Sequence, residues 1–279
     1  MNRPFLKMNG LGNDFVVVEA RTDSPFGAFA PACAEVRAIA DRERGIGCDQ
    51  LISIEPSSRA EAFARFWNAD GGEVGACGNG SRCVAWLLME ASGKDEAVFE
   101  TAAGILRARR VEGRTITLDM GEPGLDWTDI PLAEPMDTRN IELQVGPIDE
   151  PVLHTPGCVS MGNPHVVFFV PDVASAPVVE VGPLIEHHHL FPQRANVGFA
   201  EIVDRDRIRL RVWERGVGET KACGTGACAA LVAASRRGLT NRKAVIELTS
   251  GELQVEWREA DGHVLMTGPT EVEFTGTLP

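Results

Sequence analysis

The 279-residue sequence predicts an α+β protein of two pseudo-symmetric lobes produced by internal duplication. One observation is a repeated segment, Ala-Cys-Gly-Asn-Gly at 76–80 and Ala-Cys-Gly-Thr-Gly at 222–226. The other is its register, since the same offset of 146 positions brings eight identical pairs into the window 65–80. Two copies are too few for a solenoid, so we expect two lobes. Each lobe would be a curved mixed β-sheet or barrel around a central helix, with the active site in the cleft between the lobes.

Composition limits the classes of function. Hydrophobic residues make up 44% and charged residues 24% of the chain, the balance of a globular protein long enough for two domains. The net charge of −13 argues against a nucleic-acid partner, because phosphate binding needs a basic surface. No apolar segment has the length of a signal peptide core or a membrane helix, so we expect no membrane partner. Seven cysteines without a Cys-x-x-Cys pair indicate reduced thiols and a cytoplasmic protein.

The first half of the chain predicts strands before and after a helix that follows Cys77. Positions 9–13 are rich in Gly and Asn, which suit a turn between two strands. Pro31 suits the first turn of a helix in which Val36 and Ile39 recur at helical spacing. The expected strands are 5–8, 14–18, 51–54, 62–68, 98–101, 105–109 and 115–120, and the expected helices are 31–41 and 81–88.

The second half repeats this order after a stretch with frequent prolines. Between 121 and 156 the periodicity weakens, and we place the crossing between lobes near Pro123. Segments 161–168, 194–197 and 208–213 then correspond to the opening turn and strand, the loop at 48–51 and the strand before Asn68. The predicted domains are therefore 1–123, with 269–279 returning to it, and 124–268.

The repeated cysteines, Cys77 and Cys223, are candidates for acid/base chemistry. Each begins a predicted helix, where free backbone N–H groups and the helix dipole favour thiolate and can bring a thiol pKa to roughly 3.5–7.5. Two thiols on opposite faces of a tetrahedral carbon can remove and supply a proton, which inverts the carbon without redox chemistry. Backbone N–H groups at 78–79 and 224–225 are suited to hold the charge of an adjoining carboxylate. No lysine lies in an obvious pyridoxal-phosphate context.

Eight stretches, in order along nearly the whole chain, carry a resemblance to one family. They are Gly10-Leu11-Gly12-Asn13-Asp14-Phe15, Gly47-Cys48-Asp49-Gln50, Asn68-Ala69-Asp70-Gly71, Cys77-Gly78-Asn79-Gly80-Ser81-Arg82-Cys83, Met161-Gly162-Asn163-Pro164-His165, Asn196-Val197, Glu214-Arg215-Gly216 and Ala222-Cys223-Gly224-Thr225-Gly226-Ala227-Cys228. In these motifs the chain resembles the diaminopimelate epimerases, isomerases that interconvert LL- and meso-2,6-diaminopimelate in bacterial lysine and peptidoglycan precursor synthesis. The resemblance implies diaminopimelate as substrate, no pyridoxal phosphate or other cofactor, and a homodimer. Phe274 stands where some members have a tyrosine at the dimer contact.

The resemblance also implies a role for each matching residue. Cys77 and Cys223 resemble the family's proton donor and acceptor, and His165 and Glu214 resemble catalytic helpers beside them. Arg215 resembles the residue that binds the distal carboxylate, which suits a guanidinium fork. The implied substrate ligands are Asn13, Gln50, Asn68, Asn163, Asn196, Glu214 and the carboxylate-holding pairs Gly78-Asn79 and Gly224-Thr225. The chain departs from the family at Gly72, where Ser or Thr is usual, and at Ala76, where Met is frequent.

Two other interpretations remain open on the sequence. One is another cofactor-independent racemase or epimerase of the same architecture, of the proline or hydroxyproline type, although Arg215 and the asparagines fit a longer substrate. The other is a thiol-based metal or redox module, although the spacing of Cys77 and Cys83 suits neither zinc ribbons nor thioredoxin motifs. Consecutive histidines at 187–189 do not share one face, so we expect no metal site there. The remaining cysteines, Cys33, Cys48, Cys83, Cys158 and Cys228, are expected to be structural.

Overall fold

The chain forms two compact units, Met1–Asp119 with Thr267–Pro279, and Met120–Met266. In this computed structural model, residues 3–21, 28–147 and 149–278 are described. The chain passes between the units at 119/120 and at 266/267. No helix in the described ranges is long and apolar enough to cross a membrane.

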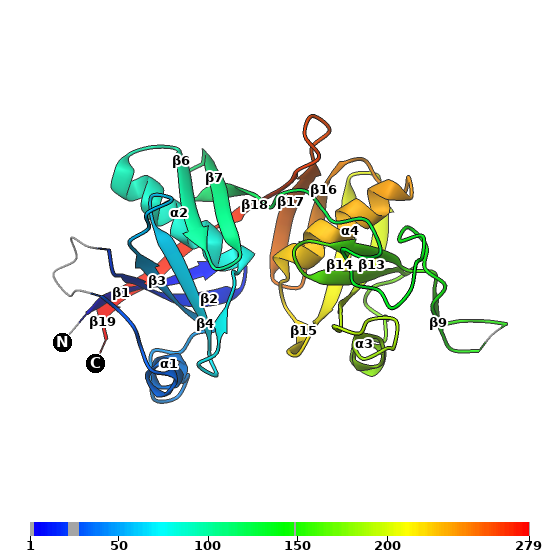
Figure 1. The fold of residues 1–279 in the computed structure, drawn as a ribbon, viewed down its shortest axis with the longest axis horizontal. Coiled ribbons are helices and arrows are strands. Elements are labelled where there is room, and N and C mark those ends of the chain that lie inside the picture. Colours follow the sequence, from blue (N-terminus) through cyan, green and yellow to red (C-terminus); the bar gives the residue numbers. More distant parts are fainter. Residues whose placement is uncertain (1–2, 22–27, 148, 279) are drawn as a thin grey trace. The chain divides into compact units, whose positions relative to one another are not determined.

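The first unit is a mixed β-sheet with a helix packed on each face (Figure 1). Its strands are β1 (Pro4–Gly10), β2 (Asn13–Glu19), β3 (Gln50–Glu55), β4 (Phe63–Asn68), β5 (Glu73–Val74), β6 (Glu96–Thr101), β7 (Gly104–Glu112), β8 (Thr115–Asp119) and β19 (Glu271–Thr277). Its helices are α1 (Cys33–Ala40) and α2 (Gly78–Ser92). β1 pairs antiparallel with β2 and β19, β2 runs parallel to β3, β3 antiparallel to β4, and β4 parallel to β6. The hairpins β4–β5, β6–β7 and β7–β8 complete the sheet.

Neighbouring residues of the central strands bury both faces of this sheet. Phe15 and Phe66 face the first turn of α2, where their rings lie 3.3 and 3.0 Å from the position that a Cβ atom on Gly80 would occupy. Val16 and Trp67 face the opposite way and pack in a cluster with apolar residues of α1. Because both faces are covered, these strands read as nearly continuous apolar runs in the sequence.

The second unit contains the remaining elements. They are β9 (Gln144–Val145), β10 (Leu153–His154), β11 (Gly157–Ser160), β12 (Pro164–Phe169), α3 (Val178–Glu186), β13 (Asn196–Asp204), β14 (Arg207–Glu214), β15 (Gly218–Thr220), α4 (Gly224–Arg236), β16 (Lys243–Leu248) and β17 (Gly251–Trp257), while β18 (Val264–Pro269) includes the second crossing between units. Residues 226–234 of α4 are all buried, so this helix is the centre of its unit.

Strand pairing in the second unit repeats that of the first. β11 is antiparallel to β12, β12 parallel to β13, β13 antiparallel to β14, and β14 parallel to β16. The hairpins β14–β15 and β16–β17 correspond to β4–β5 and β6–β7. The predicted α+β fold, with a duplicated unit of mixed sheet and central helix, is confirmed.

Helix α3 was not predicted from the sequence. Its residues include several valines together with Gly182 and Pro183, all of which disfavour a helix. Gly182 lies against the ring of Trp213, and a Cβ atom there would be 2.5 Å from the ring's Cγ. Packing on the sheet therefore outweighs local propensity in this segment.

A buried ion-pair network ties the β1–β2 hairpin to the loop before β3. The side chain of Lys7 is 5% exposed and donates to Asp14 Oδ2 at 2.6 Å and to the carbonyl of Gly47. Arg42 donates to both carboxylate oxygens of Asp14 and to Asp49 Oδ1. Burial opposes ionisation of Asp14, but the hydrogen bonds from Arg42 and Lys7 outweigh it and hold the pKa of this carboxyl below its usual range.

Replacing Lys7 by Met should lower the free energy of unfolding by about 3 kcal/mol at pH 7, because the carboxylate of Asp14 stays buried with one cation fewer. Folding lowers the pKa of Asp14, so its stabilising contribution is complete above the unfolded pKa near 4 and is lost as the pH falls toward the folded pKa. Urea unfolding from pH 7 to pH 3 measures both effects. The variant should be less stable at pH 7 and lose less stability on acidification.

An exposed ion pair provides the control for this prediction. Arg139 and Asp137 are 57% and 53% exposed, and Arg139→Met should cost less than about 1 kcal/mol. If Lys7→Met and Arg139→Met lose the same free energy of unfolding, the network around Asp14 stabilises the protein no more than an exposed ion pair does.

Candidate active site

The two candidate cysteines occupy the same position in their units. Cys77 is the N-cap residue of α2 and Cys223 that of α4, both with extended backbone (φ −139°, ψ 120° and φ −130°, ψ 105°). In the described structure neither thiol caps its own helix. The backbone N–H groups of each first turn lack intrahelical acceptors, which makes each helix start suited to bind an anion.

The half-site of the first unit places Asn13 and Asn79 in contact. Asn13 begins β2, and Asn79 lies in the first turn of α2 with 3% exposure. Asn79 Nδ2 donates to Asn13 Oδ1 at 2.6 Å, and Asn13 Nδ2 donates to Asp49 Oδ2 at 3.2 Å. Asn79 Oδ1 is buried and has no hydrogen-bond partner in the described part of the chain. The close approach depends on Gly10, where a Cβ atom would lie 2.7 Å from the backbone oxygen of Asn79.

The register of β3 and β4 brings two more predicted ligands together. Gln50 lies opposite Asn68, and its Nε2 donates to Asn68 Oδ1 at 2.9 Å. Gln50 Oε1 is buried without a partner among the residues described. The first half-site therefore contains two buried amide oxygens that can accept a hydrogen bond from a ligand.

The half-site of the second unit joins Cys223 to Glu214. The thiol of Cys223 is hydrogen-bonded to the carboxylate of Glu214, which also accepts from Thr220 Oγ1 at 2.5 Å. Burial raises the pKa of Glu214, although both hydrogen bonds oppose the rise. Burial, followed by the charge of Glu214, raises the pKa of Cys223 well above its ordinary value.

The expectation that a helix start lowers the thiol pKa is wrong for Cys223. The N–H of Gly226 and the hydroxyl of Thr225, whose Oγ1 is 3.7 Å from the sulfur, do favour the thiolate. Removal from water outweighs them, since Cys223 is 4% exposed. Cys223 therefore carries its proton at neutral pH. Cys77 is partly exposed, so the two thiols have different surroundings.

His165 is linked to Cys223 through two residues. His165 Nε2 lies 3.0 Å from Asn163 Oδ1, and Asn163 Nδ2 donates to Thr225 Oγ1 at 3.4 Å. The hydroxyl of Thr225 in turn contacts the sulfur of Cys223. Burial, with a smaller effect of Arg215, lowers the pKa of His165 to about 3, so the imidazole is neutral and donates from Nε2 to Asn163.

Asn196 supports the turn that carries Arg215. Its Nδ2 donates to the carbonyl of Pro164 at 3.0 Å, and its Oδ1 accepts from the backbone N–H of Arg215 at 3.0 Å. The guanidinium of Arg215 donates to the carbonyl of Gln193 at 2.9 Å. The nitrogen and the oxygen of the Asn196 side chain thus both have partners within the protein, and the oxygen holds the backbone of Arg215.

Three supporting residues were not identified from the sequence. Asp49 accepts a hydrogen bond from Asn13, and Thr220 donates one to Glu214. Glu186 accepts from Trp213 Nε1 and from the backbone N–H of Gly216. The position of Asp49 within the matched Gly-Cys-Asp-Gln stretch was a usable signal. Glu186 lies at the end of α3, the helix that sequence reasoning missed, so nothing in the sequence pointed to it.

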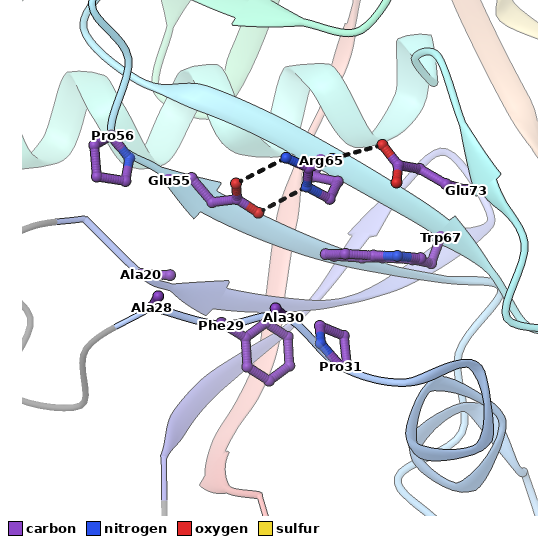
Figure 2. Close-up of a pocket in the computed structure, with 10 residues that line it drawn as sticks. All are labelled: Ala20, Ala28, Phe29, Ala30, Pro31, Glu55, Pro56, Arg65, Trp67 and Glu73. Carbon is purple, nitrogen blue, oxygen red and sulfur yellow. Dashed lines mark hydrogen bonds and ion pairs between the residues drawn. The ribbon is translucent and has the colours of Figure 1, made fainter.

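Two cavities of the first unit lie on the sheet face that α1 covers. One, of about 350 Å³, has Arg65 between Glu55 and Glu73, with the indole of Trp67 near Phe29 (Figure 2). The other, of about 500 Å³, is lined partly by residues of α1. Neither cavity is lined by a predicted site residue.

The other cysteines and the histidines form no second site in the described ranges. Cys48, Cys83, Cys158 and Cys228 are buried, whereas Cys33 is exposed. Burial raises the pKa of Cys48 to about 11 and that of Cys83 to about 12. No group of three or more His, Cys, Asp or Glu side chains in the described part of the chain is placed to hold a metal ion.

Solved structures with the same fold span the whole chain. A phenazine biosynthesis protein of the PhzF family from Enterococcus faecalis has a TM-score of 0.71 at 15% identity, covering 100% of each chain. A hydroxyproline epimerase from Agrobacterium vitis has a TM-score of 0.68 at 17% identity, covering 100% of this chain and 94% of the other. At these identities the likeness concerns the fold alone.

Sequence relatives are much closer. The family model described as diaminopimelate epimerase matches residues 5–125 and 157–273. The diaminopimelate epimerase of Phenylobacterium zucineum is 65% identical over 279 residues, covering 100% of this chain and 99% of that protein. That of Caulobacter vibrioides is 60% identical and covers 100% and 98%. The chain belongs to the diaminopimelate epimerase family.

Proposed function

We propose that the protein interconverts LL- and meso-2,6-diaminopimelate by two-base proton transfer at one α carbon, with Cys77 and Cys223 as the two bases. The observation that carries the proposal is the equivalent N-cap position of the two cysteines, each beside the N–H groups of a helix start. Membership of the diaminopimelate epimerase family supports the choice of substrate. In this proposal each unit contributes one thiol to the reaction.

In the proposed reaction one cysteine is a thiolate and the other a thiol. The thiolate removes the α hydrogen as a proton, and the carbanion takes a proton from the thiol on its opposite face. One thiolate is consumed and one is formed, so no electrons or groups leave the substrate. Backbone N–H groups at 78–79 and 224–225 hold the carboxylate on which negative charge accumulates, and each such donor is worth about 3 kcal/mol in a transition state.

The surroundings of Cys223 suit it to begin as the acid. Its raised pKa keeps the proton on sulfur, and Glu214 accepts the hydrogen bond from that thiol. When the reaction runs in the other direction, Cys223 must act as a base. The carboxylate of Glu214 is hydrogen-bonded to this thiol and is therefore the group placed to accept its proton. Thr225 then stabilises the thiolate through its hydroxyl.

The remaining site residues are proposed to bind the two ends of the substrate. Asn13, Gln50, Asn68 and Asn163 offer amide groups, and Arg215 offers its guanidinium to the distal carboxylate. His165 acts through Asn163, whose oxygen it holds at 3.0 Å, and is therefore a positioning residue.

We also propose a homodimer in the cytoplasm. Phe274 on β19 is 48% exposed and packs edge-on against Phe5, which leaves an aromatic surface for a second copy. All seven cysteines are free thiols, which suits a reducing compartment.

In deuterated water the protein should exchange the α hydrogen of diaminopimelate and interconvert its LL and meso forms. Cys77→Ala and Cys223→Ala should each lower turnover by at least about 100-fold, since each removes one general acid or base. Chiral chromatography and mass spectrometry measure conversion and deuterium uptake. The exposed cysteine gives a matched control, and Cys33→Ala should keep the parent rate.

Proline is the discriminating substrate for this experiment. Exchange with proline but not with diaminopimelate would assign the protein to a different reaction on the same fold. Full activity of either cysteine variant would exclude the two-base mechanism.

Glu214→Gln should change the pH profile in one reaction direction. The charge of Glu214 contributes to the raised pKa of Cys223, so the variant should bring this pKa down. A group that must be protonated stops working as the pH rises through its pKa. The basic limb of kcat/KM should therefore move to lower pH in the direction that uses Cys223 as the acid. Initial rates from LL and from meso substrate across pH 6–10 measure this shift, and an unchanged limb in both directions would contradict the assignment.

Mild oxidation tests whether the two half-sites share one cleft. Hydrogen peroxide should join Cys77 to Cys223 in a disulfide, with loss of two hydrogens and of activity, and a thiol reductant should restore both. Peptide mapping by mass spectrometry detects the cross-link. Inactivation without it, or a link between other cysteines, would count against a shared cleft.

A further inference from the structure

The two units hold equivalent asparagines with opposite polarity. Asn13 begins β2 and Asn163 directly precedes β12, the second strand of each repeat, and each contacts the second residue of a central helix, Asn79 or Thr225. In the first unit Asn13 accepts with Oδ1 from Asn79 Nδ2. In the second unit Asn163 donates with Nδ2 to Thr225 Oγ1. A duplicated fold therefore presents two different hydrogen-bonding groups at matching places.

The polarity in the first unit is fixed by Asp49. Its Oδ2 accepts from Asn13 Nδ2 at 3.2 Å and from the backbone N–H of Asp14 at 3.1 Å. An ionised carboxylate can only accept, so the amide nitrogen of Asn13 must face Asp49 and its oxygen must face Asn79. Asn79 then has to donate with Nδ2, and its own oxygen is directed elsewhere.

The second unit lacks this acceptor and uses a donor instead. The residue that precedes Asn196 there, where Asp49 precedes Gln50 in the first unit, is Ala195, which is buried. His165, which pairs with Asn196 as Phe15 pairs with Gln50, holds the oxygen of Asn163. The amide nitrogen of Asn163 therefore faces Thr225. One carboxylate in the first unit and one imidazole in the second set opposite orientations.

We propose that Asp49 is a positioning residue, which through Asn13 presents Asn79 Oδ1 as the acceptor for an ammonium group of the bound amino acid. Asn79 is 3% exposed, and its Oδ1 is a buried acceptor with no partner among the described residues. It lies beside the helix start proposed to hold the carboxylate, so one amino-acid end meets N–H donors and an oxygen acceptor together. The inference rests on the proposed function, because it names the group of that substrate to which Asn79 binds.

The test compares KM and kcat for diaminopimelate in Asp49 variants. Asp49→Ala frees Asn13 to rotate and should raise KM about tenfold while kcat stays within about twofold, since the ammonium charge is the same in ground and transition states. Asp49→Asn combined with Arg42→Gln should stay within about twofold of the parent KM. The amide oxygen at position 49 can accept from Asn13 and from the N–H of Asp14, and the oxygen of the glutamine at position 42 can accept from its nitrogen, which the guanidinium of Arg42 could not do. If Asp49→Ala does not fold, Asp49→Ser, whose hydroxyl is too short to reach Asn13, takes its place with the same expected KM.

A double-variant cycle distinguishes positioning from simple loss of stability. Asn79→Ala should raise KM, and adding Asp49→Ala should raise it no further, because both changes remove one acceptor. Arg42→Gln is the matched control: it breaks the contact with Asp49 Oδ1 but leaves the Oδ2 contact with Asn13, so KM should stay at the parent value.

Three outcomes would overturn the proposal. They are an unchanged KM in Asp49→Ala, equal losses in Asp49→Ala and in the double variant Asp49→Asn/Arg42→Gln, and multiplying effects of the Asp49 and Asn79 substitutions. A parent protein that exchanges no α hydrogen of diaminopimelate would instead overturn the proposed function.

Discussion

The close packing of each central helix against its own sheet is the constraint on which the candidate site depends. A Cβ atom on Gly80 would lie 2.9 Å from Ile52 Cδ1, and one on Gly226 would lie 3.1 Å from Val212 Cγ2. A larger residue at either place would force these neighbouring side chains to shift, so glycine suits a first helical turn that lies so near the strands. The residue before that turn, Cys77 or Cys223, is therefore held in place at the start of its helix. The Cys-Gly-x-Gly motif is thus a packing requirement as much as a chemical one.

The repeat allowed the sequence to predict most of the fold and the grouping of polar residues. Because Gln50 begins β3 and pairs in parallel register with Phe15 of β2, and Asn196 begins β13 and pairs likewise with His165 of β12, side chains at equivalent places recur in both units. Strand alternation and the glycine turns located the central strands and the helices after both cysteines. These signals are local, and local signals survive in the sequence whatever the rest of the chain does.

What the sequence could not show depends on contacts between distant residues. Helix α3 forms because Gly182 fits against Trp213, against the propensity of its own residues. Cys223 keeps its proton because it is buried beside Glu214, whereas its helix-start position alone suggested a thiolate. The orientation of Asn13 depends on Asp49, which lies 36 residues further along the chain. Burial and hydrogen-bond partners decide these properties, and a short sequence motif predicts neither of them.

The differences between the repeats carry the specificity that a duplication alone lacks. Two equivalent thiols suit the two faces of one carbon, since either face must be able to lose or gain a proton. The groups around that carbon are all different, so a site with two identical halves would bind the substrate in two orientations equally well. Where the first unit has Asp49 and Phe15, the second has Ala195 and His165, and the polarity of the asparagine is reversed while the strand register stays the same. A duplicated fold can in this way keep matched proton-transfer groups while its binding groups diverge.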